Sequence, residues 1–207
     1  MPGLYYSILK QIYKKAKICY NSIMLMRCFV ALNLSPEEKR KIGDFSLALK
    51  KDLPGFKFVE SDNIHLTLRF LGDISLRERQ ETESSLGKIA ANITPFALEY
   101  DGLVALPSFY QSKILGIGIR NNPALTRLYG EINSVFNLLK IGDEETRAFI
   151  PHLTLARARG FAGDLSFLRG MSISGRQKVA SLELMKSDLS KEGANYKIIQ
   201  SFNLCQK

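Results

Sequence analysis

Both histidines of the 207-residue chain open the same tetrapeptide, which occurs as His65-Leu66-Thr67-Leu68 and as His152-Leu153-Thr154-Leu155. With average residue usage, a given histidine is followed by Leu-Thr-Leu about once in a few thousand cases. Two such occurrences are therefore not expected by chance. Because imidazole changes its charge near neutral pH, the repeat predicts one site that uses both rings to transfer protons.

Each tetrapeptide fits a β-strand, in which successive side chains point to opposite faces. Alternation predicts that each histidine shares a face with its threonine, and in the first copy with Arg69. The leucines, together with Phe70, are expected on the other face and in the core. Phe29, in an apolar run upstream, is also expected in the core, since phenylalanines in strands usually pack there.

Two imidazoles and two hydroxyls around one small anion could cleave a phosphodiester. A neutral imidazole activates the attacking water, a protonated one gives a proton to the leaving oxygen, and hydroxyls bind the phosphate oxygens where charge develops. A metal site is the alternative. Threonine is a poor ligand, and no Cys, Asp or Glu lies at ligand spacing around either histidine. The sequence therefore predicts neither a metal nor another cofactor.

These motifs resemble the signature of the two-histidine phosphoesterases, and most closely the RNA 2',3'-cyclic phosphodiesterases, also called 2'-5' RNA ligases. The resemblance covers about residues 26–204. Besides the motifs, it rests on an opening strand at 26–32, a Phe-Leu-Gly tail at 70–72, central strands at 105–118, and a C-terminal hairpin with Ser187, Leu189, Gly193 and Tyr196.

The resemblance implies roles for individual residues. His65 would be the proton donor, His152 the proton acceptor, and Thr67 and Thr154 the phosphate-binding hydroxyls of an enzyme that opens a terminal 2',3'-cyclic phosphate to a 2'-phosphomonoester. Arg157 stands where the family keeps an arginine near its phosphate. As motif positions only, four leucines are also assigned to substrate binding: Leu66, Leu68, Leu153 and Leu155.

Three alternatives stay open at this point. The same site could join a 2',3'-cyclic phosphate to a 5'-hydroxyl, as a reversible 2'-5' RNA ligase. It could act on a small cyclic nucleotide such as ADP-ribose 1'',2''-cyclic phosphate, or the chain could be a non-catalytic RNA-binding module. Comparing a cyclic-phosphate oligonucleotide with a mononucleotide would separate these possibilities.

Composition agrees with a globular, RNA-directed protein. The net charge of +9 favours a polyanionic partner, and three scattered cysteines suggest reduced thiols in the cytoplasm. No stretch is long enough for a transmembrane helix, and we expect a monomer without an obligate protein partner. Residues 1–25 contain four lysines and no acid, and we interpret them as a basic extension ahead of a domain at 26–207.

The remaining patterns predict an α+β fold. Ser35-Pro36 begins a helix with a serine cap and a proline at its first position; further helices are expected near 76–91 and 122–139. Strands are expected at 27–33, 64–70, 96–105, 112–119, 152–156, 178–186 and 196–203. By resemblance, these elements form two lobes: two pseudo-symmetric antiparallel sheets flanked by helices, with a central cleft between them.

Overall fold

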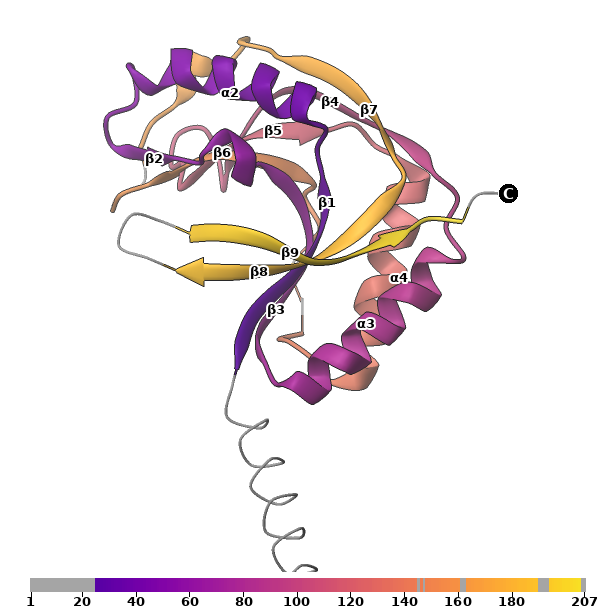
Figure 1. Ribbon diagram of the computed structural model, residues 1–207. Helices are drawn as coiled ribbons and strands as arrows, with labels where there is room; N and C mark the ends of the chain where they lie inside the picture. Colours follow the sequence, from indigo (N-terminus) through magenta and orange to yellow (C-terminus); the bar gives the residue numbers. More distant parts are fainter. Residues whose placement is uncertain (1–24, 145, 147, 161–162, 190–193, 206–207) are drawn as a thin grey trace, which may run out of the picture.

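The computed structural model describes residues 25–144, 146, 148–160, 163–189 and 194–205 (Figure 1). Apart from Leu25, the proposed extension at 1–25 lies outside this range. The described part is built from a curled antiparallel sheet with helices packed against it, so the expected α+β class is confirmed.

Nine strands form the sheet, in the order β7-β4-β5-β6-β3-β1-β8-β9, with β2 beside β6. All strand pairs are antiparallel. The strands are β1 (Met26–Asn33), β2 (Phe56–Phe58), β3 (His65–Ile74), β4 (Phe96–Leu106), β5 (Ile114–Ile119), β6 (His152–Ala158), β7 (Ser174–Val179), β8 (Ser181–Leu189) and β9 (Ala194–Asn203). The two expected sheets are joined into one, because β3 pairs with β6 through Leu66 and Leu153.

The three expected helices are confirmed as α2 (Pro36–Lys50), α3 (Leu76–Ala90) and α4 (Pro123–Leu139), with short 3-10 turns at Ser61–Asn63 and Ser166–Leu168. Each begins at a capping side chain that accepts hydrogen bonds from the first turn: Ser35, Ser75 and Asn122.

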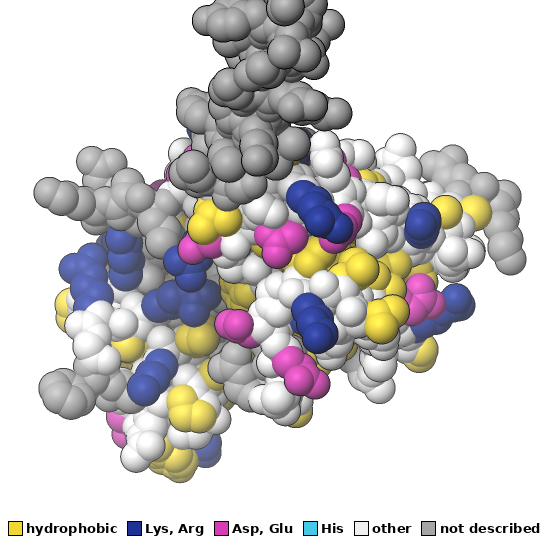
Figure 2. Space-filling model, turned by 90° about the horizontal axis from the view of Figure 1, so that it is seen from below, with side chains coloured by type: hydrophobic (Ala, Val, Ile, Leu, Met, Phe, Trp, Pro, Cys, Tyr) yellow, Lys and Arg dark blue, Asp and Glu magenta, His cyan; other side chains and the backbone are white. Residues whose placement is uncertain are grey.

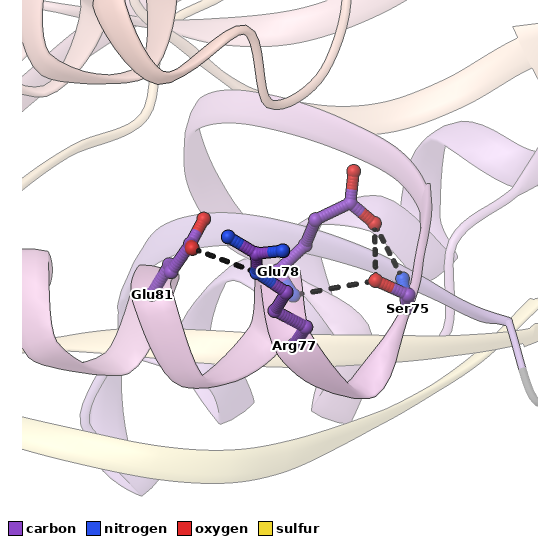
Figure 3. A network of polar contacts seen from close by, with 4 residues as sticks. All are labelled: Ser75, Arg77, Glu78 and Glu81. Carbon is purple, nitrogen blue, oxygen red and sulfur yellow. Dashed lines mark hydrogen bonds and ion pairs between the residues drawn. The ribbon is translucent and has the colours of Figure 1, made fainter. Parts of the chain in front are cut away.

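Helix α3 begins with a reciprocal capping box (Figure 3). The Ser75 hydroxyl accepts from the Glu78 backbone N–H at 3.3 Å, while the Glu78 carboxylate accepts from the Ser75 backbone N–H at 2.7 Å. Arg77 pairs with Glu81 one turn later. Because the box satisfies two otherwise unpaired groups, it fixes where β3 ends and α3 begins despite the helix's largely polar sequence.

The two halves of the sheet are built alike around the β3–β6 pair. On one side the chain runs from β1 through α2 and the short β2 to β3, and on the other it runs β5-α4-β6. In each unit the second strand carries the His-Leu-Thr-Leu motif and pairs with the first. We refer to these as the His65 half (β3, β1, β8, β9) and the His152 half (β6, β5, β4, β7).

The helices of the two units pack on opposite halves. Helix α2, from the β1-α2-β3 unit, contacts the His152 half: Glu38 accepts a hydrogen bond from Tyr100 of β4, and Lys41 donates to the Ser174 carbonyl of β7 at 2.6 Å. Helix α4 contacts the His65 half, where Asn133 and Asn137 accept from Arg69 of β3. This exchange interlocks the halves in one structural unit.

One expected strand is divided between two strands of the structure, and the short strand β2 was not predicted. The stretch at 178–186 is extended as expected, but Ala180 separates β7 of the His152 half from β8 of the His65 half. Most residues of β7 are polar, and only Val179 of this strand is buried. The first residues of β7 therefore lack the alternation of apolar and polar side chains that predicts a strand. Strand β2 spans three residues, too few for a periodic pattern.

Candidate active site

The two motifs lie side by side at the centre of the sheet. Leu66 pairs with Leu153 in an antiparallel register, which sets His65 opposite Thr154 and Thr67 opposite His152. Since paired residues of adjacent strands point to the same face, both imidazoles and both hydroxyls share one face. The four motif leucines lie on the other, each at most 3% exposed, in the core and away from the cavity described below.

Both imidazoles are oriented by the same backbone contact. The carbonyl oxygen two residues upstream accepts a hydrogen bond from Nδ1, at 2.7 Å for His65 from Asn63 and at 2.8 Å for His152 from Ile150. A carbonyl can only accept, so Nδ1 carries a proton in both rings. Each ring therefore exchanges its second proton at Nε2, and Nε2 of His65 lies 3.0 Å from the Thr67 hydroxyl.

A β-bulge follows the threonine in both motifs. On β3, Thr67 pairs with Ala31 but Arg69 pairs with Val30, so Leu68 is the extra residue. On β6, Leu155 is extra in the same way opposite β5. A bulge shifts the alternation of side chains by one residue, so the residues after it point to faces that simple alternation does not predict.

The bulge overturns two predictions for β3. Arg69, expected on the His65 face, is 4% exposed and binds α4 and the Asp143 carbonyl. Phe70, expected in the core, is 61% exposed. The same shift on β6 buries Ala156 and exposes Arg157. Phe29 is buried, as expected.

A cavity of about 1130 Å³ opens on the motif face. It brings together His65, Thr67, Thr154 and Arg157, all of which the sequence nominated. His152 is partly exposed and is not among the lining residues. Phe70 and Asn63 also line the cavity; sequence reasoning weighed Phe70 as a surface for a base but assigned it to the core, and it noted Asn63 and Tyr196 only as parts of the family resemblance.

Aromatic rings enclose His65. Its ring centroid lies 4.8 Å from Phe29 and 5.1 Å from Tyr196, which meets it edge-on. Burial lowers the pKa of His65 to about 4, and the positive charges of Lys39 and Arg157 act in the same direction. The Asn63 hydrogen bond opposes this shift only in part. At neutral pH these effects favour the uncharged form of His65.

Gly116 of β5 makes room for the second imidazole. A Cβ atom at this position would lie 2.7 Å from the Leu153 carbonyl oxygen and 3.2 Å from Cδ2 of His152. Backbone contacts under 3.0 Å do not occur without a shift, so only glycine fits beside His152 as it stands.

The matching position in the His65 half is Ala31, which pairs with Thr67 as Gly116 pairs with Thr154.

Comparison with known proteins assigns the chain to a family. A family model described as LigT-like phosphoesterase matches residues 34–115. The RNA 2',3'-cyclic phosphodiesterase of Aeropyrum pernix is 30% identical over 151 residues, covering 69% of this chain and 83% of that protein. The chain belongs to the LigT-like phosphoesterase family. The enzyme of the same name from Archaeoglobus fulgidus is 29% identical over 181 residues, covering 86% of this chain and 99% of that protein.

Solved LigT-like structures share the fold. A Thermus thermophilus protein superimposes with a TM-score of 0.74 at 23% identity, covering 86% of this chain and 98% of that one. Escherichia coli LigT in complex with 3'-AMP gives a TM-score of 0.69 at 22% identity, covering 88% of this chain and 99% of that one. The fold expected from the motifs is therefore shared with these structures.

Other reactive groups of this LigT-like chain do not form a second centre within its described part. Cys28 lines the cavity, but burial raises the pKa of its thiol to about 11, so it is a poor nucleophile at neutral pH. Among the described residues, no group of three or more His, Cys, Asp or Glu could hold a metal ion. No helix in that part is long and apolar enough to cross a membrane.

Proposed function

We propose that this LigT-like phosphoesterase is an RNA 2',3'-cyclic phosphodiesterase that opens a terminal 2',3'-cyclic phosphate to a 2'-phosphomonoester. The observation that carries the proposal is the motif pair itself. Two imidazoles with the same fixed tautomer lie on adjacent strands, on the same face as two threonine hydroxyls and beside Arg157. The curated relatives that match most of the chain are named for this activity.

The proposed reaction is an in-line displacement at phosphorus. Nε2 of His152 takes a proton from water as the water oxygen attacks the phosphorus atom. The bond between phosphorus and the 3'-oxygen breaks, and Nε2 of His65 gives its proton to that oxygen. The products are a 2'-phosphomonoester and a free 3'-hydroxyl, and a proton exchange between the rings and solvent restores the starting state.

Thr67, Thr154 and Arg157 would stabilise the charge that develops on the non-bridging oxygens. A hydroxyl donates one hydrogen bond to such an oxygen, and a guanidinium can donate two. These three donors supply the electrostatic stabilisation that a metal ion provides in other phosphodiesterases. We therefore propose that catalysis needs no metal, and that EDTA leaves the rate unchanged.

The donor role of His65 requires a charged ring, whereas its burial in the protein favours the neutral ring at pH 7. The substrate resolves this difference. A cyclic phosphate is an anion, and an opposite charge within about 4–6 Å favours the charged imidazole. Binding of the substrate would thus raise the pKa of His65. The ring would then carry the proton that it donates only in the enzyme–substrate complex.

The charge distribution supports an RNA substrate. Figure 2 shows Lys and Arg side chains gathered at the end of the molecule where Figure 1 places β2, whereas acidic and basic side chains are interspersed over the rest of that face. Strand β2 places Lys57 next to Arg157 in the sheet register. A basic surface beside a phosphate site attracts the phosphates of a longer polyanion.

The test is an assay on a short RNA that ends in a 2',3'-cyclic phosphate, with EDTA present. We expect ring opening by the wild type and a loss of about 10²–10⁴-fold in kcat for His65→Gln and for His152→Gln. Arg127→Gln is the control, because this exposed arginine of α4 pairs with Glu131 and lies outside the cavity; it should keep wild-type activity.

Near-normal turnover by either histidine variant would contradict the acid–base pair. Loss of wild-type activity in EDTA would contradict metal independence. The oligonucleotide is compared with its mononucleotide, since a marked preference for the mononucleotide would favour the small cyclic nucleotide alternative.

A further inference from the structure

The turn before β3 carries the carbonyl that orients His65. This 3-10 turn, Ser61–Asn63, ends at the residue whose carbonyl oxygen accepts a hydrogen bond from Nδ1 of His65 at 2.7 Å. A backbone carbonyl has no rotamer of its own, so its direction depends on how the turn is held. The contacts that hold the turn therefore also hold the tautomer of His65.

Helix α2 contacts the turn at two points. Lys39 donates from Nζ to the carbonyl oxygen of Asp62, the residue directly before Asn63, at 2.5 Å. Gly43 lies four residues further along the helix and therefore on the same helix face. A Cβ atom at Gly43 would lie only 2.9 Å from Cβ of Ser61. The helix thus packs directly on the start of the turn and binds the middle of it through the lysine.

Strand β9 holds the last residue of the turn. The side-chain amide of Asn63 donates to the Ala194 carbonyl at 3.0 Å and accepts from the backbone N–H of Tyr196 at 3.4 Å. The Tyr196 ring meets the His65 ring edge-on. Each residue of the turn therefore has its own contact, and the contact at Asp62 is made by a charged side chain.

The charge of Lys39 acts on both sides of the turn. Burial lowers the pKa of its ammonium group, and the carboxylates of Asp62 and Glu183 oppose that shift. Glu183 is 4% exposed, so little water screens its attraction to the ammonium. Burial is the main cause of the low pKa of His65, and the charge of Lys39 adds to it. Lys39 is thus close enough to His65 to act on it through its charge as well as through the backbone.

The His152 half holds its orienting carbonyl without a charge. That carbonyl belongs to Ile150. The residue directly before it, Phe149, stacks on Tyr129 of α4, with ring centroids 3.8 Å apart and planes at 10°. In both halves, the helix that connects the two paired strands holds the residue before the orienting carbonyl. The contact is a lysine hydrogen bond in the His65 half and an aromatic stack in the His152 half.

We propose that Lys39 is a positioning residue for His65. By binding the Asp62 carbonyl, it keeps the Asn63 carbonyl where Nδ1 donates to it, and so leaves Nε2 as the atom that carries the transferred proton. Lys39 is not among the residues that line the cavity, so it acts through His65 and not on the substrate. This role rests on the proposed function, because that function makes Nε2 of His65 the atom that gives up a proton.

The test reads the tautomer of each ring by nitrogen NMR of the labelled protein. The chain has two histidines, and the His152→Gln variant assigns their signals. At about pH 9, well above the ordinary pKa of imidazole, the nitrogen shifts distinguish a proton on Nδ1 from a proton on Nε2. Lys39→Met removes the ammonium and keeps the apolar stem, whereas Lys39→Arg keeps the charge and a donor.

Lys41→Met is the matched control. Lys41 lies on the same helix and also donates from Nζ to a backbone carbonyl, that of Ser174 at 2.6 Å, but its partner belongs to β7. We expect the Nδ1-protonated tautomer at both histidines in wild type, Lys39→Arg and Lys41→Met.

In Lys39→Met, we expect at least about a tenth of the molecules to carry the proton on Nε2 of His65, because the Asn63 hydrogen bond is weakened. The tautomer of His152 should not change. With a terminal 2',3'-cyclic phosphate as substrate, kcat should fall about tenfold while KM stays within about threefold of wild type, because the donor is misplaced and the cavity is intact. Lys39→Arg should restore kcat to within about threefold. Lys39→Gln, whose shorter side chain ends before the position of Nζ, should repeat the result of Lys39→Met and replaces it if that variant does not fold.

Three results would overturn the proposal. The first is an unchanged His65 tautomer in Lys39→Met and Lys39→Gln. The second is an equal change at both histidines, which would mean a general loosening of the fold. The third is an altered His65 tautomer with unchanged kcat, since the orientation of the ring would then not matter for turnover. Failure of the proposed function gives a different result, in which wild type does not open the cyclic phosphate. The tautomer comparison then still decides whether Lys39 positions His65.

Discussion

His65 and His152 have the same backbone setting and very different surroundings. Each ring donates from Nδ1 to the carbonyl two residues upstream, and each motif ends in a β-bulge. Around His65 stand the aromatic rings of Phe29 and Tyr196. Beside His152, the matching strand has Gly116, which has no side chain. The fold thus repeats the geometry of the proton-transfer group while the environment of each copy differs.

This difference suits a substrate that is itself asymmetric. A terminal cyclic phosphate has a ribose and base on one side of phosphorus and needs a water molecule on the other. The His65 side offers aromatic surface, including the exposed ring of Phe70, and the His152 side carries the exposed Arg157 at the matching position, three residues after the motif threonine. Symmetric backbone and asymmetric side chains together explain how two identical tetrapeptides can have two roles.

The largest expected effect tests whether the two copies act as one unit. In the proposed mechanism one ring is useless without the other, so the double variant His65→Gln/His152→Gln should lose about as much kcat as the worse single variant. Cyclic-phosphate turnover of the four proteins gives the double-mutant cycle. If the fold losses in kcat of the two single variants multiplied in the double variant, the two imidazoles would contribute independently. That result would contradict the proposal that they act as one acid–base pair.

A smaller effect is expected from giving the His152 copy the residue that the His65 copy has. Ala31 is accommodated opposite Thr67, but an alanine at position 116 would press on the Leu153 carbonyl and on the His152 ring. We expect Gly116→Ala to lower the free energy of unfolding by about 1–3 kcal/mol and to lower kcat, because the ring is displaced. Urea denaturation and the cyclic-phosphate assay measure the two effects.

Gly130→Ala is the matched control for this substitution. Gly130 lies within α4, and a Cβ atom there would meet nothing within 4 Å. Alanine favours a helix over glycine by about 1 kcal/mol, so this variant should be more stable and fully active. If Gly116→Ala behaved like Gly130→Ala, the close approach of β5 to His152 would have no functional meaning.

Local sequence signals predicted most of the elements. The serine cap of α2 and the apolar face of α4 predicted those helices within a residue or two, since capping and periodicity act within one or two turns. The pairing of β3 with β6, which joins the halves into one sheet, is a contact between distant segments. No pattern inside either strand encodes it, so it could not be predicted from the strands themselves.

The paired histidines of the candidate site were predictable from the sequence, and their neighbours were not. A repeated tetrapeptide revealed His65 and His152, but the carbonyls that orient them belong to Asn63 and Ile150, and any residue type supplies a carbonyl. Phe70 was assigned to the wrong face because strict alternation was assumed through Leu68. A bulge is set by the partner strand, so the sequence of β3 alone gives no sign of it.

The last expected effect concerns stability and separates the two imidazoles by pH. The folded state holds the pKa of His65 at about 4, below its ordinary value of 6.5, because burial disfavours the charged ring. Between these two values the unfolded chain binds this proton and the folded chain does not. The contribution of His65 to folding is therefore complete above about pH 6.5 and is lost as the pH falls toward 4.

Urea denaturation at several pH values between 4 and 7 measures this loss, whose slope for one proton cannot exceed about 1.4 kcal/mol per pH unit. His65→Gln should flatten that part of the profile, because glutamine has no proton to gain. His152→Gln should keep the slope, because the slope originates at His65. Equal flattening by both substitutions would mean that the aromatic enclosure of His65 does not distinguish the rings, and the asymmetry would then reside in Phe70 and Arg157 alone.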